Sequence, residues 1–483
     1  MEQSDGPKRP KLVDAADGDE DRLSVLPDDI LIDILAKLHR TTMDARTSVL
    51  SRRWRGLWKL LPVLNFPLGT EPPLGIEPKH IVSALTSHEA PVIRHLIVSL
   101  REAAAESVAM WLPIIAPRLF GELSIFNLRW DRDREIGTVE LPCFQSADRI
   151  CLNLDDHGLA LPPSGVFARL TYLRMISIRM RGPCRLGDIV SSPRCPLLQK
   201  LFLRDSYVQD DVVVIHSESL LEIGIDNVLL HHDALGLRIL AICSESVLQI
   251  DLKNLALRQL LVVAPALISL KEKGTHYIAD AVDLSQPVVN ISAPQLMLLE
   301  WNASYDRSSV QFGKMAHLQW LHAGQFLDMS EHQCYLMEDM PRLPYILFLS
   351  VNVAANEHSF GASLFHVLRL CSSVRKLTIA FDVSTRQLEA QTTCSLGCIC
   401  HQPPNWKTDE LLLGTENEVA FVERFLNWAT VLKEMTITFH QSVTESNAED
   451  LCQTLLSFSR PETCMKFYMY RGLYAKVPYV PEG

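Results

Sequence analysis

LTYLRMISI (residues 170–178) and PLLQKLFL (residues 196–203) are two examples of one short apolar pattern with an L-x-x-L-x-L core. From about residue 92 the chain repeats this pattern, each time as a short apolar strand followed by a turn or a helix. The equivalent apolar residue recurs at steps of 20 to 30 residues. The positions predicted to be equivalent are Leu96, Leu123, Ile150, Ile176, Leu201, Ile223, Ile250, Leu270, Leu299, Leu321, Leu347 and Leu377.

This period predicts a leucine-rich-repeat solenoid, because a step in the twenties with such a core is typical of that architecture. Each strand would pair with the next, so that the repeats share one core and curve into a horseshoe. The steps are uneven and the usual asparagine position is irregularly filled, which predicts some distorted repeats. An ordinary α/β domain is the alternative, but it would not keep the step through eleven intervals. We expect the solenoid over residues 66–385.

The composition is that of a globular protein. Hydrophobic residues make up 47% of the 483 residues, charged residues 21%, and the formal net charge is −11. The acidic total disfavours general nucleic-acid binding, which needs a concentrated positive surface. Residues 1–20 are polar and are expected to be a disordered leader without a secretory signal, and no apolar run predicts a membrane span. The twelve irregularly spaced cysteines favour free thiols in a reducing compartment.

Residues 21–65 predict a small helical module. Pro27 suits the first turn of a helix, and the two aspartates after it favour the positive end of the helix dipole. Ile30, Ile34 and Leu38 then form an apolar stripe, with Leu31 and Leu35 beside it. A second helix is expected over 43–50, and a third from near Ser51 to just before Pro62.

The third helix separates its aromatic residues from its cations. One predicted face carries Trp54, Leu57, Trp58 and Leu61, and another carries Arg52, Arg55 and Lys59. A base-stacking surface would mix the two kinds of side chain, so this pattern favours a packed helix with a basic flank. Periodicity alone leaves two interpretations open: a cap on the following domain, or a module that docks on a partner.

The motifs LPDDIL and TSVLSRRWRGLW, in that order, resemble the F-box of plant-type F-box proteins over residues 22–61. The resemblance implies docking onto the Skp-type adaptor of a cullin–RING ubiquitin ligase, with the basic flank steering the chain to an acidic adaptor. The chain departs from the family at Leu38-His39-Arg40, where a Leu-Pro step is common. Carried over by position, the adaptor-binding residues are Leu26, Pro27, Ile30, Leu31, Val49, Leu50 and Trp54.

The sequence offers weak candidates for chemistry. His231 and His232 beside Asp233 are more typical of a surface turn than of a metal site, because neighbouring residues point in different directions. CSLGCICH (394–401) raises the hypothesis of zinc, but its spacing is poor and a second ligand pair is missing nearby. We therefore expect no catalytic residue, no cofactor and no metal.

Residues 386–483 are expected to form a C-terminal αβ cap over the edge of the last repeat. Thr415 and Glu418 predict a capping box that opens a helix over 416–429, and VLKEMTITF predicts a strand. A helix over 446–458 and a strand over 464–470 are expected to follow. The region resembles the FBD region of plant F-box/leucine-rich-repeat proteins, but residues 411–414 predict a shortened or lost strand.

Together these features predict an α+β / α/β solenoid that serves as the substrate-recognition subunit of a Skp–cullin–F-box ubiquitin ligase. The target protein stays unknown, and neither nucleic acid nor membrane is an expected partner. A non-degradative protein-binding scaffold is the alternative. Lys8-Arg9-Pro10-Lys11 is either a nuclear-import signal or a solvated charge cluster, so the expected location is the nucleus, the cytoplasm or both.

Overall fold

The computed structural model has a mixed α/β, repeat-type fold that consists mostly of strands. The structure describes residues 26–37, 54–68, 77–128, 137–230, 237–277, 289–302, 310–323, 345–353, 373–381, 419, 422–423, 426–427, 431–439, 444–471 and 475–481. The leader, the second expected helix, the His231–His232 pair, the cysteine cluster at 394–401 and the segment 411–414 lie outside these residues. The capping-box pair Thr415 and Glu418 does so too.

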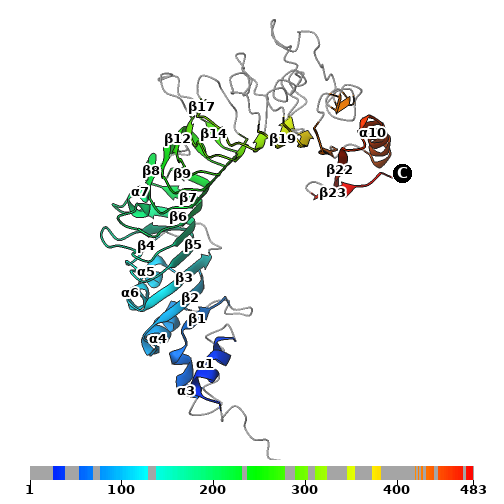
Figure 1. Ribbon diagram of the computed structural model, residues 1–483. Helices are drawn as coiled ribbons and strands as arrows, with labels where there is room; N and C mark the ends of the chain where they lie inside the picture. The colour runs from blue at the N-terminus through cyan, green and yellow to red at the C-terminus, as the bar shows by residue number, and fades with distance from the viewer. Residues whose placement is uncertain are drawn as a thin grey trace, which may run out of the picture.

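A sheet of seventeen strands follows the length of the described chain and curves as an arc (Figure 1). Successive strands pair in parallel, β4 lies beside β5, and the last strand, β23, is antiparallel to β22. In chain order the strands are β1 (Val63–Phe66), β2 (Ile93–Arg101), β3 (Leu119–Leu128), β4 (Thr138–Glu140), β5 (Arg149–Ala160), β6 (Tyr172–Arg181), β7 (Lys200–Val208), β9 (Glu222–Leu230), β11 (Gln249–Lys253), β13 (Ser269–Lys273), β16 (Leu298–Trp301), β18 (Trp320–Ala323), β19 (Phe348–Val353), β20 (Lys376–Phe381), β21 (Glu434–Thr438), β22 (Cys464–Arg471) and β23 (Ala475–Tyr479).

The pairing register aligns ten of the twelve predicted repeat positions and corrects two. In β6 it is Leu173, and not Ile176, that pairs with Ile150 of the preceding strand β5. Leu349, and not Leu347, pairs with Leu321. Strand side chains alternate between faces, so the three-residue shift from Leu173 turns Ile176 away from the buried face. In the second case the run YILFL offers two leucines of the same parity, and only the sheet distinguishes them.

A second layer covers the outer side of the arc (Figure 1). In the early repeats it consists of short helices: α4 (Pro78–Ser87), α5 (Ala105–Ala109), α6 (Leu112–Ile115) and α7 (Leu186–Val190). Pro78 at the first turn and the buried pair Ile81 and Leu85 account for α4. Later repeats have instead a six-stranded sheet: β8 (Val212–His216), β10 (Leu237–Cys243), β12 (Ala256–Val263), β14 (His276–Tyr277), β15 (Val289–Ser292) and β17 (Val310–Phe312).

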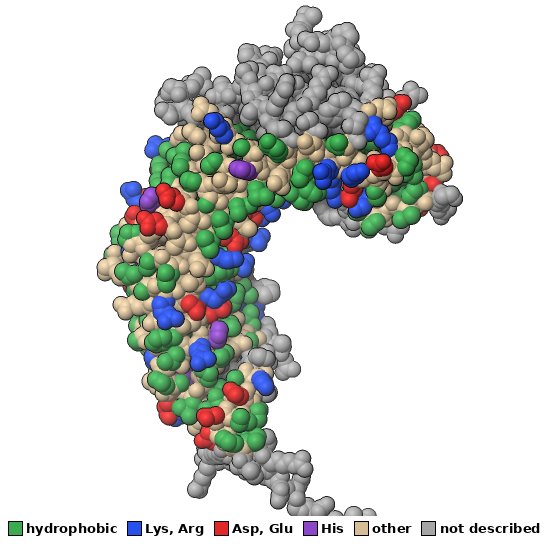
Figure 2. Space-filling model, in the orientation of Figure 1, with side chains coloured by type: hydrophobic (Ala, Val, Ile, Leu, Met, Phe, Trp, Pro, Cys, Tyr) green, Lys and Arg blue, Asp and Glu red, His purple; other side chains and the backbone are tan. Residues whose placement is uncertain are grey.

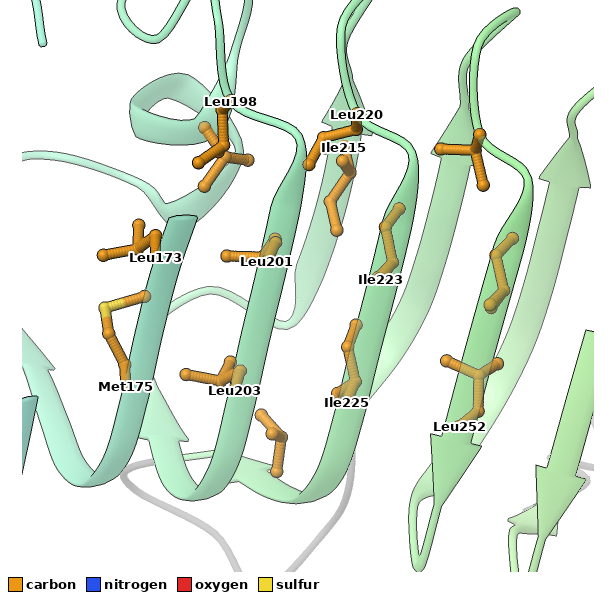
Figure 3. Packing of buried hydrophobic residues seen from close by; sticks show 14 of the residues in the cluster. Leu173, Met175, Leu198, Leu201, Leu203, Ile215, Leu220, Ile223, Ile225 and Leu252 are labelled. Carbon is orange, nitrogen blue, oxygen red and sulfur yellow. The ribbon is translucent and has the colours of Figure 1, made fainter. Parts of the chain in front are cut away.

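The core lies between these layers as rows of apolar side chains, one from each strand (Figure 3). Leu173, Leu201 and Ile223 form one such row, and Met175, Leu203 and Ile225 form the next. Ile215 of β8 points into the same core from the outer sheet, and all seven side chains are 4% exposed or less. Truncation of one of these leucines to alanine is therefore expected to cost about 2–5 kcal/mol.

Several strands bend at one common position, four residues after the aligned apolar residue. The backbone there is left-handed, which a side chain with a Cβ rarely adopts and which glycine and short polar residues tolerate best. These strands accordingly carry Ser177, Asp205, Asn227, Asn254 and Gly274, with φ between 46° and 66°. The amide of Asn227 donates to Asp205 Oδ1 of the preceding repeat at 2.8 Å, and the bends are thereby joined side by side.

The N-terminal helices are α1 (Asp28–Ala36), α3 (Trp54–Leu57) and the 3-10 turn η2 (Trp58–Leu60). The buried side of α1 is formed by Leu31 and Leu35, which are fully buried. The predicted apolar stripe began at Ile30, but this side chain is 44% exposed. Leu57 and Leu61 are buried as predicted for the third helix.

At the other end of the chain, helix α10 (Glu445–Phe458) and strands β21 and β22 confirm the predicted elements. Thr444 caps α10 by accepting a hydrogen bond from the Asn447 amide. In the segment expected to be helical over 416–429, the described residues are helical, and Val422 and Leu426 are buried.

Candidate protein-docking faces

The first turn of α1 presents an accessible apolar edge. Leu26 is half-buried, Pro27 is exposed and Ile30 is 44% exposed, so these three predicted residues lie together on one short segment. Leu31 is fully buried in the chain's own core, so in this arrangement it packs the helix and does not face solvent. Val49 and Leu50 lie outside the described residues, and only the backbone of Trp54 is described.

A second apolar side chain, Leu60, is 41% exposed on η2, and sequence reasoning did not single it out. The turn is anchored in the core by Leu57 and Leu61, the residues on either side of it, which are both buried. Lys59, next to it, forms an ion pair with Glu89 at 2.8 Å. Helix α1 packs against both α3 and η2, which brings the described parts of the helical module together.

The helical module is joined to the first repeats by hydrogen bonds around His88. The ring Nε2 of His88 lies 2.9 Å from the carbonyl oxygen of Leu61, at the end of η2. Arg118 donates to Nδ1 of the same ring at 2.7 Å and to the backbone oxygens of His88 and Ala90. Burial lowers the pKa of His88 below its ordinary value, with Arg118 adding to the effect and the Leu61 hydrogen bond opposing it. The junction is therefore ordered around a neutral imidazole.

The inner face of the arc offers a second, extended surface. Alternate residues of each strand point away from the core and align across the sheet in rows. The row at the start of the strands contains many side chains of opposite charge. Glu122 lies between His95 at 4.0 Å and Arg149 at 3.6 Å, and Lys200 pairs with Glu222 at 2.6 Å. Such exposed pairs contribute about 0–1 kcal/mol each, so they add little stability and can exchange partners.

Aromatic side chains interrupt these charges at two places on the inner face. In the first, the guanidinium of Arg149 lies 4.2 Å from the ring centre of Tyr172, and that ring lies 5.6 Å from Phe202. Gly224 makes room beside them, since a Cβ there would lie 2.6 Å from the Phe202 ring. In the second, Trp320 and Phe348 stack on adjacent strands with ring centres 3.7 Å apart. Arg, Trp and Tyr are the residues that most often dominate protein interfaces.

Candidates for metal binding and covalent chemistry are few in the part of the chain that the structure describes. No group of three or more His, Cys, Asp or Glu side chains is arranged there to hold a metal ion. The seven cysteines among these residues are free thiols, and burial raises the pKa of Cys195 and Cys452 to about 12. No helix in the described ranges is long and apolar enough to span a membrane.

Comparison with known proteins gives a family match for the N-terminal module. Residues 23–66 match the F-box domain model. A putative F-box/FBD/LRR-repeat protein of Arabidopsis thaliana is 30% identical over 186 residues, which is 38% of this chain and 41% of the relative. A putative F-box/LRR-repeat protein of the same plant is 30% identical over 212 residues, or 42% and 48% of the two chains.

A third relative, an F-box/FBD/LRR-repeat protein of Arabidopsis thaliana, is 40% identical over 113 residues, which is 22% of this chain and 26% of the relative. The chain thus spans less than half the length of the curated relatives that it matches.

Fold and sequence together define a repeat protein of mostly parallel strands with a small helical module at its N-terminal end. The F-box match and the relatives make the chain similar to plant F-box/leucine-rich-repeat proteins, several of which carry an FBD region.

Proposed function

We propose that the chain is the substrate-recognition subunit of a Skp–cullin–F-box ubiquitin ligase. The F-box would bind the Skp-type adaptor, and through it the cullin–RING ligase, while the repeats bind a target protein. The chain would act by raising the effective concentration of the target near a ubiquitin-charged enzyme, and not by chemistry of its own. We assign it no catalytic residue, cofactor or metal.

The observation that carries this proposal is the F-box match over residues 23–66 together with the accessible edge of α1. Leu26, Pro27 and Ile30 supply an apolar contact that a partner could bury, and the repeats leave this edge open to solvent. We infer that Val49, Leu50 and Trp54 extend the contact through a three-helix F-box whose second helix covers 43–50. Leu31 then supports the face from within and makes no direct contact.

Adaptor capture tests this proposal. The full-length chain, mixed with a purified Skp-type adaptor, should retain the adaptor on an affinity resin, and Leu26→Asp or Trp54→Ala should abolish retention. Val263→Asp is the matched control, because Val263 is 40% exposed on the outer sheet, far from α1 in the fold. Adaptor retention by both F-box variants would show that the docking face is assigned wrongly.

A non-degradative scaffold is the second candidate, and the junction around His88 is the observation that favours it. Lys59, Leu61 and Arg118 tie the helical module to the first repeats, as a cap on the solenoid would be tied. A scaffold of this kind would leave the adaptor in the unbound fraction of the same experiment, so one measurement separates the two functions.

We further infer the larger organisation of the chain. The F-box would occupy residues 21–65, a leucine-rich-repeat horseshoe residues 66–385, and an FBD-like cap residues 386–483. Strand β1 already pairs with β2 and strands β21–β23 continue the same sheet, which supports joined units rather than separate domains. The Lys8–Lys11 cluster supports a location in the nucleus as well as the cytoplasm, which imaging of a variant with these cations neutralised would test.

A further inference from the structure

The upper arm of the arc carries an apolar band beside a cleft. Figure 2 shows hydrophobic side chains along the inner edge where the arc turns toward its C-terminal arm, with charged side chains farther along. Trp320 is 46% exposed although it stacks on Phe348, and Met297, which directly precedes the neighbouring strand β16, is 37% exposed. Singly exposed apolar residues are ordinary on a protein surface, but a contiguous band marks an interaction site.

A cleft of about 580 Å³ adjoins this band. Gln319, Leu347 and Arg375, the residues just before β18, β19 and β20, line it side by side, because backbone hydrogen bonds join each of them to the next repeat. Tyr345 and Val431, which are 63% and 46% exposed, lie on its rim. The remaining lining residues are Ala316, His317 and Ser373. Four of these eight lining residues are apolar or aromatic and four are polar or charged, so the cleft offers both apolar surface and polar groups, as binding pockets usually do.

The charge of the cleft indicates which partner would fit. Among the described residues that line it, Arg375 is the one permanently charged side chain, and no carboxylate of the described ranges pairs with its guanidinium. Next to it, Lys376 and Lys466 share the single carboxylate of Glu434, while Lys433 pairs with Glu462. In this described area four cations thus share two carboxylates. A carboxylate from a partner would meet an unpaired guanidinium and a local positive excess.

We propose that this cleft and the Trp320–Phe348 pair bind an extended acidic segment of the target protein, an inference that rests on the proposed function. Trp320 belongs to β18, and Arg375 directly precedes β20, two strand positions farther on, which is roughly 10 Å at the usual strand spacing. An extended chain rises about 3.3 Å per residue and turns every second side chain to the same side, so two residues four apart span this distance on one side of the segment. The segment would place a bulky apolar side chain on the stacked rings and an acidic side chain, four residues farther on, at Arg375.

Peptide binding to the full-length chain tests the inference. The probe is a fluorescein-labelled peptide that contains Leu-Gly-Ser-Gly-Glu in a glycine–serine background, and its binding is followed by fluorescence polarisation. Trp320→Ala and Arg375→Glu should each weaken binding about tenfold or more, which is the usual cost at a dominant interface residue. Val263→Ala, at a similarly exposed valine of the outer sheet, should leave binding unchanged.

A charge exchange makes the test specific. A second peptide, with lysine in place of the glutamate, should bind the native chain about tenfold more weakly and should regain affinity for Arg375→Glu. Equal binding of both peptides to the native chain, or indifference to both variants, would overturn the inference. So would competition by a single-stranded oligonucleotide at the strength of the acidic peptide, because charge alone would then account for binding.

Failure of the inference can be told apart from failure of the proposed function. Adaptor capture depends on the F-box at the other end of the arc, so Trp320→Ala and Arg375→Glu should retain the adaptor as the native chain does (Figure 1). A chain that captures the adaptor but whose peptide binding ignores both substitutions refutes the cleft alone. Loss of adaptor capture in the native chain refutes the ligase function itself.

Discussion

Arg118 donates a hydrogen bond to Nδ1 of His88 at 2.7 Å, and the other ring nitrogen of the same histidine contacts the Leu61 carbonyl. With Nδ1 accepting, the ring hydrogen is assigned to Nε2, and the imidazole is neutral. A second proton would have to enter at Nδ1, directly facing a guanidinium. The hydrogen bonds that join Leu61 to Arg118 through this ring therefore require one protonation state of one buried side chain.

We predict that acid loosens this junction. The pKa of His88 is lowered in the folded chain, so below about pH 6.5 the unfolded state binds a proton that the folded state does not. Stability is thus fully present above that pH and falls as the pH falls, by at most about 1.4 kcal/mol per pH unit. Thermal unfolding between pH 7.5 and 5.5 measures the slope.

His88→Gln should flatten this pH slope, because glutamine can donate to the Leu61 carbonyl without titrating. His322, whose pKa burial also lowers, leaves part of the slope in place. His80→Gln, at an exposed histidine on α4, is the control and should keep the native slope. An unchanged slope in His88→Gln would contradict the assignment of the acid sensitivity to this junction.

Substitutions at Ile30 and Leu31, two neighbouring residues of α1, should affect adaptor docking and packing differently. Ile30 is 44% exposed, so Ile30→Ala is expected to weaken adaptor capture while changing stability by less than about 1 kcal/mol. Leu31 is fully buried, so Leu31→Ala should cost about 2–5 kcal/mol within the helical module. Hydrogen exchange of α1 and adaptor capture, measured on both variants, check the pair. Equal effects of the two substitutions on both readouts would contradict this division.

The repeat strands could be predicted from the sequence because each contributes an apolar residue at a regular step. All twelve predicted strands are present, and the two misplaced positions, Ile176 and Leu347, lie in runs with several apolar residues of competing register. The outer sheet was not predicted, although VVVIH (212–216) and LRILAIC (237–243) are recognisable strand sequences. Such apolar runs also suit a buried helix. Only the small number of residues between successive inner strands favours a short outer strand over a helix.

At the left-handed bends, substitution by glycine should cost less stability than substitution by alanine, which is the reverse of the usual order within a strand. At Asn227, with φ of 51°, alanine is strained by about 1–2 kcal/mol whereas glycine is not, and both lose the hydrogen bond to Asp205. We expect Asn227→Ala to be less stable than Asn227→Gly by about 1 kcal/mol in chemical denaturation. Asn153 of β5 has no left-handed backbone, so the order should reverse there, with Asn153→Gly the less stable variant. The same order at both positions would contradict the argument.

The candidate sites were less accessible to prediction than the fold. The F-box motif pointed to α1, but periodicity could not tell that Leu31 packs inward while Ile30 stays exposed, since adjacent helical residues differ by only 100° or so. Trp320 and Arg375 are 55 residues apart in the chain and belong to unremarkable repeats. Their proximity arises only from the stacking of successive strands, which a single sequence does not reveal.

The last strand protects the end of the sheet, and its removal is the final prediction. β23 pairs antiparallel with β22, and Tyr479 donates to Glu449 at 2.9 Å and packs edge-on against Phe439. A chain that ends at residue 474 would leave the eight-residue strand β22 unpaired on one edge, and such an edge can recruit another chain. Light scattering after size-exclusion chromatography should then detect oligomers. Tyr479→Phe, which loses the hydroxyl bonds but keeps the strand, should stay at the native mass, and a truncated chain of native mass would show that β22 needs no cover.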